Sequence, residues 1–220
     1  MRQTVVAALV SLSDDPDAAA RVLRLGATQR EEIAHNARLV TAATMSAMDR
    51  YTGVLYDALG ADTLDAPARA WLRRHVAIHS APFGLVGAGD AIPNYRMGVA
   101  VRMPGLPQPK QLWADATADA LTAASPGFVL DLRSDAYRAT APIPAEVASG
   151  YVRVLAATPD GTGRALNHFN KHSKGSFVRD LATARPRVNS ERALLRWAGE
   201  AGWTMRSVAS GELELIVGAH

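Results

Sequence analysis

The sequence predicts an α/β fold (α+β mixed), with a single compact domain in which a mixed central sheet is surrounded by helices. Three patterns predict this class: helical periodicity over residues 1–50, short apolar or alternating runs in the middle, and both patterns in the last third. The chain has 220 residues, of which 48% are hydrophobic and 20% charged, so it can bury a substantial core. We expect one domain over residues 1–220, with a helical part at 1–50 and a sheet-containing body at 51–220.

The N-terminal part is predicted to be helical from Arg2 onward. Apolar residues recur there with helical spacing, at Val5, Val6, Leu9 and Val10. Asp15 before Pro16 is typical of an N-cap followed by proline at the first helical position. Thr28 opens a segment with capping-box spacing, which predicts another helix start. A further helix is predicted over Asp65–His75.

The middle of the chain is predicted to contribute strands. Val76–His79 is a short apolar run, Gly98–Met103 alternates, and Phe128–Leu132 has a stronger strand pattern. Leu112–Ala124 has a helical pattern between the last two, so strand–helix–strand order is expected there.

The last third is predicted to combine hairpins with helices. Tyr151–Ala157 and Arg164–Phe169 are β-runs separated by a strong turn signal, Pro159-Asp160-Gly161. The patterns that follow predict helices over Ser176–Ala184 and from Ser190 through Gly202, and then a closing hairpin of Trp203–Val208 and Glu212–Val217.

One basic segment, NHFNKHSKGSFVR at Asn167–Arg179, is the most informative stretch of the chain. It contains no acid, and its Lys174-Gly175 pair precedes an apolar-periodic run, which predicts a basic loop feeding a helix. Such a junction offers ammonium groups and unpaired backbone N–H donors, and both favour an anion. Residues 164–187 carry six Lys and Arg against one Asp, although the net charge of the chain is only +3. The alternative is a solvated charge run beside an ordinary helix start.

Several classes of protein are excluded or disfavoured. The chain has no cysteine, which excludes disulfides, thiol catalysis and thiolate metal sites. It has no Walker loop and no Gly-x-Ser-x-Gly elbow, and its six histidines give no convincing metal site, so we expect no metal and no cofactor. No run approaches the ~18 apolar residues that cross a bilayer, and the apolar start does not resemble a signal peptide. We expect a cytoplasmic protein without membrane association, with a monomer favoured.

Polar residues lie beside several of the predicted elements. Tyr51 precedes an aliphatic helix and could face a ligand, although we prefer a reading in which Thr52 simply caps that helix. Ser80 follows an apolar run, at what could be the carboxyl end of a strand, where ligands of open α/β sheets bind. Arg96 lies in an irregular polar segment, where it either pairs with Asp90 or points its guanidinium at a phosphate.

A second polar group follows the most apolar predicted strand. This group consists of Asp131, Arg133, Ser134, Asp135 and Tyr137. Polar residues in this position either close the sheet or line a cleft.

Taken together, these segments resemble the YaaA family of peroxide-stress proteins. The resemblance runs from Tyr51 to Val217 and rests on Tyr51-Thr52-Gly53-Val54-Leu55-Tyr56, on Ser80, Phe83, Gly84 and Leu85, on Asp90, Ile92, Pro93, Tyr95, Arg96 and Met97, on Trp113, on Val129, Asp131, Leu132, Ser134 and Tyr137, and on His168, Phe169, Lys171, Lys174 and Gly175. It implies a compact α/β body with a positively charged cleft and a helix-hairpin-helix-like element. It also implies a DNA-binding protein that limits oxidative DNA damage under peroxide stress and is associated with lowered free intracellular iron.

The start of the chain departs from the family pattern. Members usually begin with an apolar strand and a Pro-rich, Lys-containing loop, whereas this chain starts straight into a predicted helix at Arg2. We therefore expect that strand and loop to be absent, which would expose a sheet edge. Gly87-Ala88-Gly89 also stands where a bulkier stretch, often with Arg-Pro, is usual.

The sequence favours a DNA-binding protein of oxidative-stress defence that holds double-stranded DNA, or another phosphate-bearing ligand, by its phosphates in a basic cleft without sequence specificity. The expected contacts are Arg96, Arg133, Lys171, Lys174 and Arg179. The main alternative is an enzyme that acts on a small anionic or nucleotide-like substrate in the same cleft, with Tyr51, Ser80, Asp131, Tyr137, His168 and Lys171 as candidate groups. A third possibility is a protein-interaction module at the exposed edge. The first two require cationic side chains from distant segments to converge.

Overall fold

The computed structural model describes residues 1–157, 164–165 and 167–218, and it describes no side chains for 164–165 and 167–169. Helices and strands are mixed along the chain, which confirms the predicted α+β class, and the strands in the described residues form three sheets. Internal contacts divide the chain into two compact units. Unit 1 comprises Met1–Arg50, Val76–Ala120 and Ser134–Pro142, and unit 2 comprises Tyr51–His75, Leu121–Arg133 and Ile143–His220. The predicted single domain stays a prediction.

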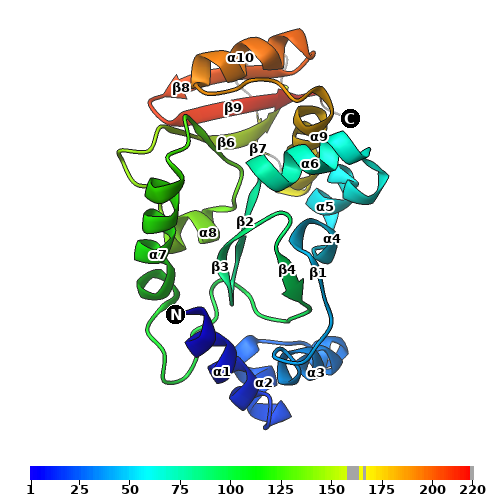
Figure 1. Ribbon diagram of the computed structural model, residues 1–220, viewed down its shortest axis with the longest axis vertical. Coiled ribbons are helices and arrows are strands. Elements are labelled where there is room, and N and C mark those ends of the chain that lie inside the picture. Colours follow the sequence, from blue (N-terminus) through cyan, green and yellow to red (C-terminus); the bar gives the residue numbers. More distant parts are fainter. Residues whose placement is uncertain (158–163, 166, 219–220) are drawn as a thin grey trace. The chain divides into compact units, whose positions relative to one another are not determined.

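Unit 1 begins with helices, as predicted. They are α1 (Arg2–Leu12), α2 (Pro16–Leu23), the 3₁₀ helix η1 (Ala27–Glu32) and α3 (Ile33–Ala37), and Figure 1 shows α1, α2 and α3 gathered together. Asp15 caps α2, because its carboxylate accepts from two backbone N–H groups of the first turn at 3.0 Å each. The predicted helix start at Thr28 is wrong, because the N-cap of η1 is Gly26, whose N–H donates to the Gln29 side chain.

The strands of unit 1 form antiparallel pairs. β1 (Thr44–Ser46) pairs with β4 (Ala91–Pro93), and β2 (Ala77–Ser80) pairs with β3 (Gly84–Gly87). The predicted strand at Val76–His79 is thus confirmed to within one residue. The helices of this unit are α4 (Ala47–Arg50), α8 (Asp135–Thr140) and most of α7 (Pro109–Ala124), the last of which was predicted over Leu112–Ala124.

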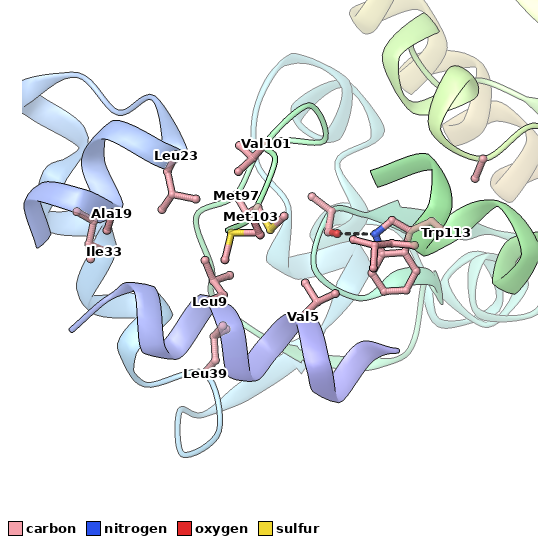
Figure 2. Close-up of a cluster of buried hydrophobic side chains, with 13 residues drawn as sticks. Val5, Leu9, Ala19, Leu23, Ile33, Leu39, Met97, Val101, Met103 and Trp113 are labelled. Atoms are coloured by element: carbon pink, nitrogen blue, oxygen red, sulfur yellow. Dashed lines mark hydrogen bonds between the residues drawn. The ribbon is translucent and has the colours of Figure 1, made fainter. Parts of the chain in front are cut away.

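Helices and loop residues together build the core of unit 1. Val5 and Leu9 of α1 pack in one cluster with Val101 and Met103, which belong to a loop (Figure 2). The predicted strand over Gly98–Met103 is wrong, since this segment forms turns instead. Its alternating pattern arises because alternate side chains are buried in the core, a condition that a loop can satisfy as well as a strand.

Unit 2 is built on a mixed sheet, which has five strands within the described residues. Its strands are β5 (Val129–Asp131), β6 (Ser149–Ala156), β7 (Arg164–Ala165), β8 (Thr204–Ala209) and β9 (Glu212–Val217). The order is β5-β6-β9-β8, with β7 paired to β6. β6 runs parallel to β5 and β9, whereas the β6–β7 and β8–β9 pairs are antiparallel. The predicted closing hairpin is confirmed, but the strand predicted over Arg164–Phe169 ends at Ala165 because a helix begins two residues later.

The helices of unit 2 are α5 (Val54–Leu59), η2 (Ala61–Thr63), α6 (Ala66–His75), α9 (Asn167–Ala184) and α10 (Glu191–Glu200). Of these, α9 and α10 pack against the sheet, whereas α5 and α6 pack on α9. Figure 1 shows α10 running alongside β8 and β9. Side chains from β6 and β9 form one buried cluster with residues of α9 and α10, namely Val152, Val154, Leu213, Leu215, Phe177, Leu181, Leu194 and Ala198. Ser190 caps α10 as predicted, because its hydroxyl accepts from the Ala193 N–H at 3.3 Å.

In unit 2, α5 and α9 pack closely at Gly175. A Cβ atom on Gly175 would lie 2.1 Å from the carbonyl oxygen of Leu55, so only glycine allows the two backbones to approach this far. The N-cap of α5 is Gly53 and not the predicted Thr52, and the Gly53 N–H donates to the Asp57 carboxylate at 3.3 Å.

Candidate functional site

The basic segment is helical throughout its described length. α9 begins at Asn167, so the predicted loop that feeds a helix near Ser176 is wrong. The backbone N–H groups of Lys174 and Gly175 therefore lie inside a helix, where they bond to carbonyls of the preceding turn. They do not form the N-terminal anion site that the sequence predicts.

The buried face of α9 changes character along its length. Phe177, Val178 and Leu181 are buried and apolar, whereas Ser173 and Lys174 are buried and polar, with exposed fractions of 7% and 4%. Asn170 lies one turn before Lys174, at the i and i+4 positions that share a helix face. We call Asn170, Ser173 and Lys174 the polar half of the buried face of α9.

A buried carboxylate stands at the end of β5. Asp131 is the last residue of this strand and pairs in register with Tyr151 of β6. Arg133 folds back onto it, since its Nε and Nη2 donate to the two carboxylate oxygens at 2.8 Å each and its backbone N–H donates at 3.1 Å. This bidentate geometry is the strongest form of an arginine–carboxylate pair.

The electrostatics of Asp131 link this pair to α9. Burial alone would raise the pKa of the Asp131 carboxyl, but the hydrogen bonds and charge of Arg133, together with the charge of Lys174, outweigh it and hold the pKa below its ordinary value. The Lys174 ammonium also lies 5.4 Å from the centroid of the Tyr151 ring, within the range of a cation–π contact. Asp131, Arg133, Lys174 and Tyr151 therefore form one cluster in unit 2, with the polar half of α9 along one side.

Asn170 supplies an unusual acceptor in this polar half. Its side-chain oxygen Oδ1 is buried and has no hydrogen-bond partner among the described residues. Leaving a buried polar atom without a partner costs on the order of 1–3 kcal/mol, so such atoms are uncommon in folded proteins.

The other predicted phosphate contacts have different surroundings. Lys171 is exposed on α9. Arg179 donates to the carbonyl oxygens of Leu59 and Gly60 and to the Thr63 hydroxyl, at 2.8, 3.0 and 2.9 Å, and so ties α9 to the end of α5. Among the predicted contacts, the structure thus brings Arg133 and Lys174 into one cluster.

Arg96 belongs to unit 1, with partners of its own. Its Nη1 lies 3.6 Å from Glu32 Oε2, and the Asn36 side chain bonds to its backbone N–H and carbonyl at 2.8 Å each. The alternative of a pair with Asp90 is wrong, because the Asp90 carboxylate accepts from the Gly87 N–H.

The candidate enzyme residues fall into separate groups. Ser80, at the hairpin end of β2, is fully buried and donates to the Tyr95 hydroxyl at 2.9 Å. Tyr137 packs against His79, with ring centroids 5.3 Å apart, and both residues belong to unit 1. In unit 2, Tyr51 stacks on Tyr56 at 5.2 Å.

His168 lies in α9, but its side chain is outside the described residues. Across the described part of the chain, no three His, Cys, Asp or Glu side chains gather as metal ligands would. None of the described helices combines the length and apolarity needed to cross a bilayer.

Sequence reasoning missed one member of the cluster, Tyr151, and two residues of the polar half of α9, Asn170 and Ser173. Asn170, Ser173 and Lys174 have the i, i+3, i+4 spacing of one helix face. A predicted helix that began at Asn167 would therefore have placed all three residues on the same face. Tyr151 has no such signal, because its strand pattern is equally compatible with a purely structural residue.

Comparison with known proteins agrees with the resemblance noted in the sequence. A family model described as peroxide stress protein YaaA matches residues 1–207. A UPF0246 protein of Corynebacterium efficiens is 40% identical over 209 residues, which cover 93% of this chain and 81% of the relative. A UPF0246 protein of Streptomyces coelicolor is 42% identical over 184 residues, covering 82% of this chain and 70% of the relative. The chain belongs to the peroxide stress protein YaaA family, whose name supports a role in peroxide stress.

Proposed function

We propose that the protein binds the phosphate backbone of double-stranded DNA without sequence specificity, as part of the response to peroxide stress. The distribution of charge carries this proposal. Unit 1 has 10 Lys and Arg against 10 Asp and Glu, whereas unit 2 has 14 against 11, so the whole net charge of +3 belongs to unit 2. Within unit 2, residues 164–187 hold six Lys and Arg and a single Asp. A concentrated positive region attracts a polyanion even when the net charge is small.

Burial decides how each cation of this region would act. Lys171, Arg185 and Arg187 are exposed and are the direct phosphate contacts in this proposal. Arg133 and Lys174, which flank Asp131, add positive potential from the interior. Arg179 holds α9 in place through its three hydrogen bonds. Arg96, in unit 1, stays a predicted contact.

The test compares charge reversals at two lysines. Lys171→Glu should weaken binding to duplex DNA by about tenfold at low salt, equally for unrelated sequences, and lower the slope of log affinity against log salt by roughly one. Lys110→Glu is the matched control, because Lys110 is exposed in the electrically neutral unit 1 and the substitution changes the net charge by the same amount. Lys174 is unsuitable for this test, since a glutamate there would be buried beside Asp131.

Gel-shift and fluorescence-anisotropy titrations between about 50 and 200 mM salt would measure both quantities. The proposal requires Lys110→Glu to bind like wild type. Equal losses for the two variants would mean that net charge alone matters, and wild-type affinity in Lys171→Glu would contradict the assignment of the DNA surface to α9.

A further inference from the structure

We propose that the polar half of α9, together with the Asp131–Arg133 pair, binds a small phosphate monoester that carries a hydroxyl group near its phosphate, as sugar phosphates and mononucleotides do. This inference goes beyond DNA binding and does not depend on it. DNA binding uses the exposed side chains of Lys171, Arg185 and Arg187, whereas the small-molecule site uses the buried side chains of Ser173 and Lys174.

The first argument is the chemistry of the buried face. Two turns of α9 supply Phe177, Val178 and Leu181 to the interior, yet the turn before them supplies Ser173 and Lys174 at 7% and 4% exposure. Burying an ammonium group costs desolvation free energy, which the attraction to Asp131 and the Tyr151 ring does little more than offset. Stability alone would favour a continuous apolar face.

The second argument is the set of cationic donors. Arg133 and Lys174 both act on Asp131, since each of their charges lowers the pKa of that carboxyl. The formal charge of these three groups is +1, and the planar guanidinium and the ammonium are the two side chains that proteins use most for phosphate. The Arg133 side chain keeps 17% of its surface exposed, so the cluster reaches solvent at that end.

The third argument is the Asn170 oxygen. This acceptor is buried and has no partner among the described residues, so it is complementary to a ligand that brings a hydrogen-bond donor. Asn170 stands one helical turn from Lys174, on the same face. A ligand whose hydroxyl lies about one helical turn from its phosphate can therefore meet the cations and this acceptor at once, whereas inorganic phosphate is too small to span that distance.

The experiment uses isothermal titration calorimetry with ribose 5-phosphate, adenosine monophosphate, inorganic phosphate and ribose. Wild-type protein should bind both phosphate esters, bind inorganic phosphate more weakly, and not bind ribose. Comparing the two esters shows whether a base adds affinity, and so separates a nucleotide from a sugar phosphate as the natural source of this chemistry.

Two isosteric substitutions assign the contacts. Asn170→Leu should weaken ribose 5-phosphate by about tenfold, the effect of one hydrogen bond to a desolvated group, and leave inorganic phosphate unchanged. Lys174→Met should weaken both ligands. Lys171→Met is the control, because the side chain of that lysine is exposed and is not part of the proposed site, and the variant should bind both ligands like wild type.

Two results would overturn the proposal: no saturable binding of either ester to wild-type protein at millimolar concentration, or equal ester affinity in Asn170→Leu and wild type. Circular dichroism checks that each variant is folded. If Lys174→Met does not fold, the Asn170→Leu comparison decides alone. A failed gel shift with intact ester binding would reject DNA binding only, and the reverse result would reject this site only.

Discussion

The two ends of the buried face of α9 both contact strand β6, one through apolar side chains and the other through a charged side chain. Phe177 and Leu181 share a hydrophobic cluster with Val152 and Val154, whereas Lys174 lies over the ring of Tyr151. The apolar end contributes roughly 2 kcal/mol for each large side chain that it removes from water. The polar end contributes much less, because the desolvation of charged groups offsets their mutual attraction. One helix thus stabilises the unit with one end and holds charged and polar groups with the other.

The largest expected effect breaks the apolar end. Phe177 is fully buried and lies edge-on to the rings of Trp197 and Trp203, at 5.5 and 5.2 Å. Phe177→Ala should therefore lower the free energy of unfolding by about 4 kcal/mol. Urea denaturation followed by tryptophan fluorescence measures the change. Val40→Ala is the control, because Val40 is 78% exposed and should change stability by no more than about 0.5 kcal/mol. A loss below about 1 kcal/mol for Phe177→Ala would show that the apolar end does not anchor the helix.

An intermediate effect is expected at the carboxylate that faces the polar end. Asp131→Asn leaves Arg133 and Lys174 without their shared charge partner and should cost about 3 kcal/mol at neutral pH. The pKa of Asp131 is lowered in the folded state, so its contribution is fully present above the unfolded value of about 3.9 and is lost as the pH falls through the lower folded value. The stability difference between wild type and variant should therefore shrink below about pH 4.

Urea denaturation at a series of pH values provides this test. Asp62→Asn, at an exposed carboxylate, is the matched control and should follow wild type throughout. A difference between Asp131→Asn and wild type that is constant down to the lowest pH would rule out the ionised pair as its origin.

The smallest effect sharpens the comparison further. Asn170→Leu removes a buried acceptor that has no partner among the described residues and extends the apolar face by one turn. The variant should equal wild type in stability or exceed it by up to about 1 kcal/mol, because no hydrogen bond is lost. Thermal unfolding in the absence of ligand is sufficient to measure this. A destabilisation of more than about 1 kcal/mol would mean that Asn170 has a structural role.

Sequence patterns correctly predicted helices whose first residues include a recognisable capping residue. The sequence predicts the start of α2 from Asp15 and Pro16, and the start of α10 from Ser190. Both predictions succeed because a helix cap depends on residues next to it in the sequence. Gly98–Met103 was misread because alternation reports which side chains are buried and not which backbone carries them.

The start of α9 was misread for a different reason. Glycine disfavours helices, so the Lys174-Gly175 pair predicted a boundary. The structure uses Gly175 for close contact with Leu55, a residue from a distant part of the sequence, and no local pattern announces such a contact. The same error hid the site: Lys174 and Asp131 were both singled out, but Asn170 and Ser173 join them only on a continuous helix. The pairing of Asp131 with Tyr151 depends on strand register, which the sequence does not specify here.

The contact between Gly175 and Leu55 has a mechanical consequence for the neighbouring lysine. Because even a Cβ atom at position 175 would collide with the Leu55 carbonyl, α9 and α5 are in close main-chain contact beside Lys174, and this contact limits how much closer the two helices can come. We therefore expect substitutions among the charged groups around Lys174 to leave the contact between α5 and α9 in place. That property makes this position a rigid reference from which the binding preferences of the protein can be redesigned.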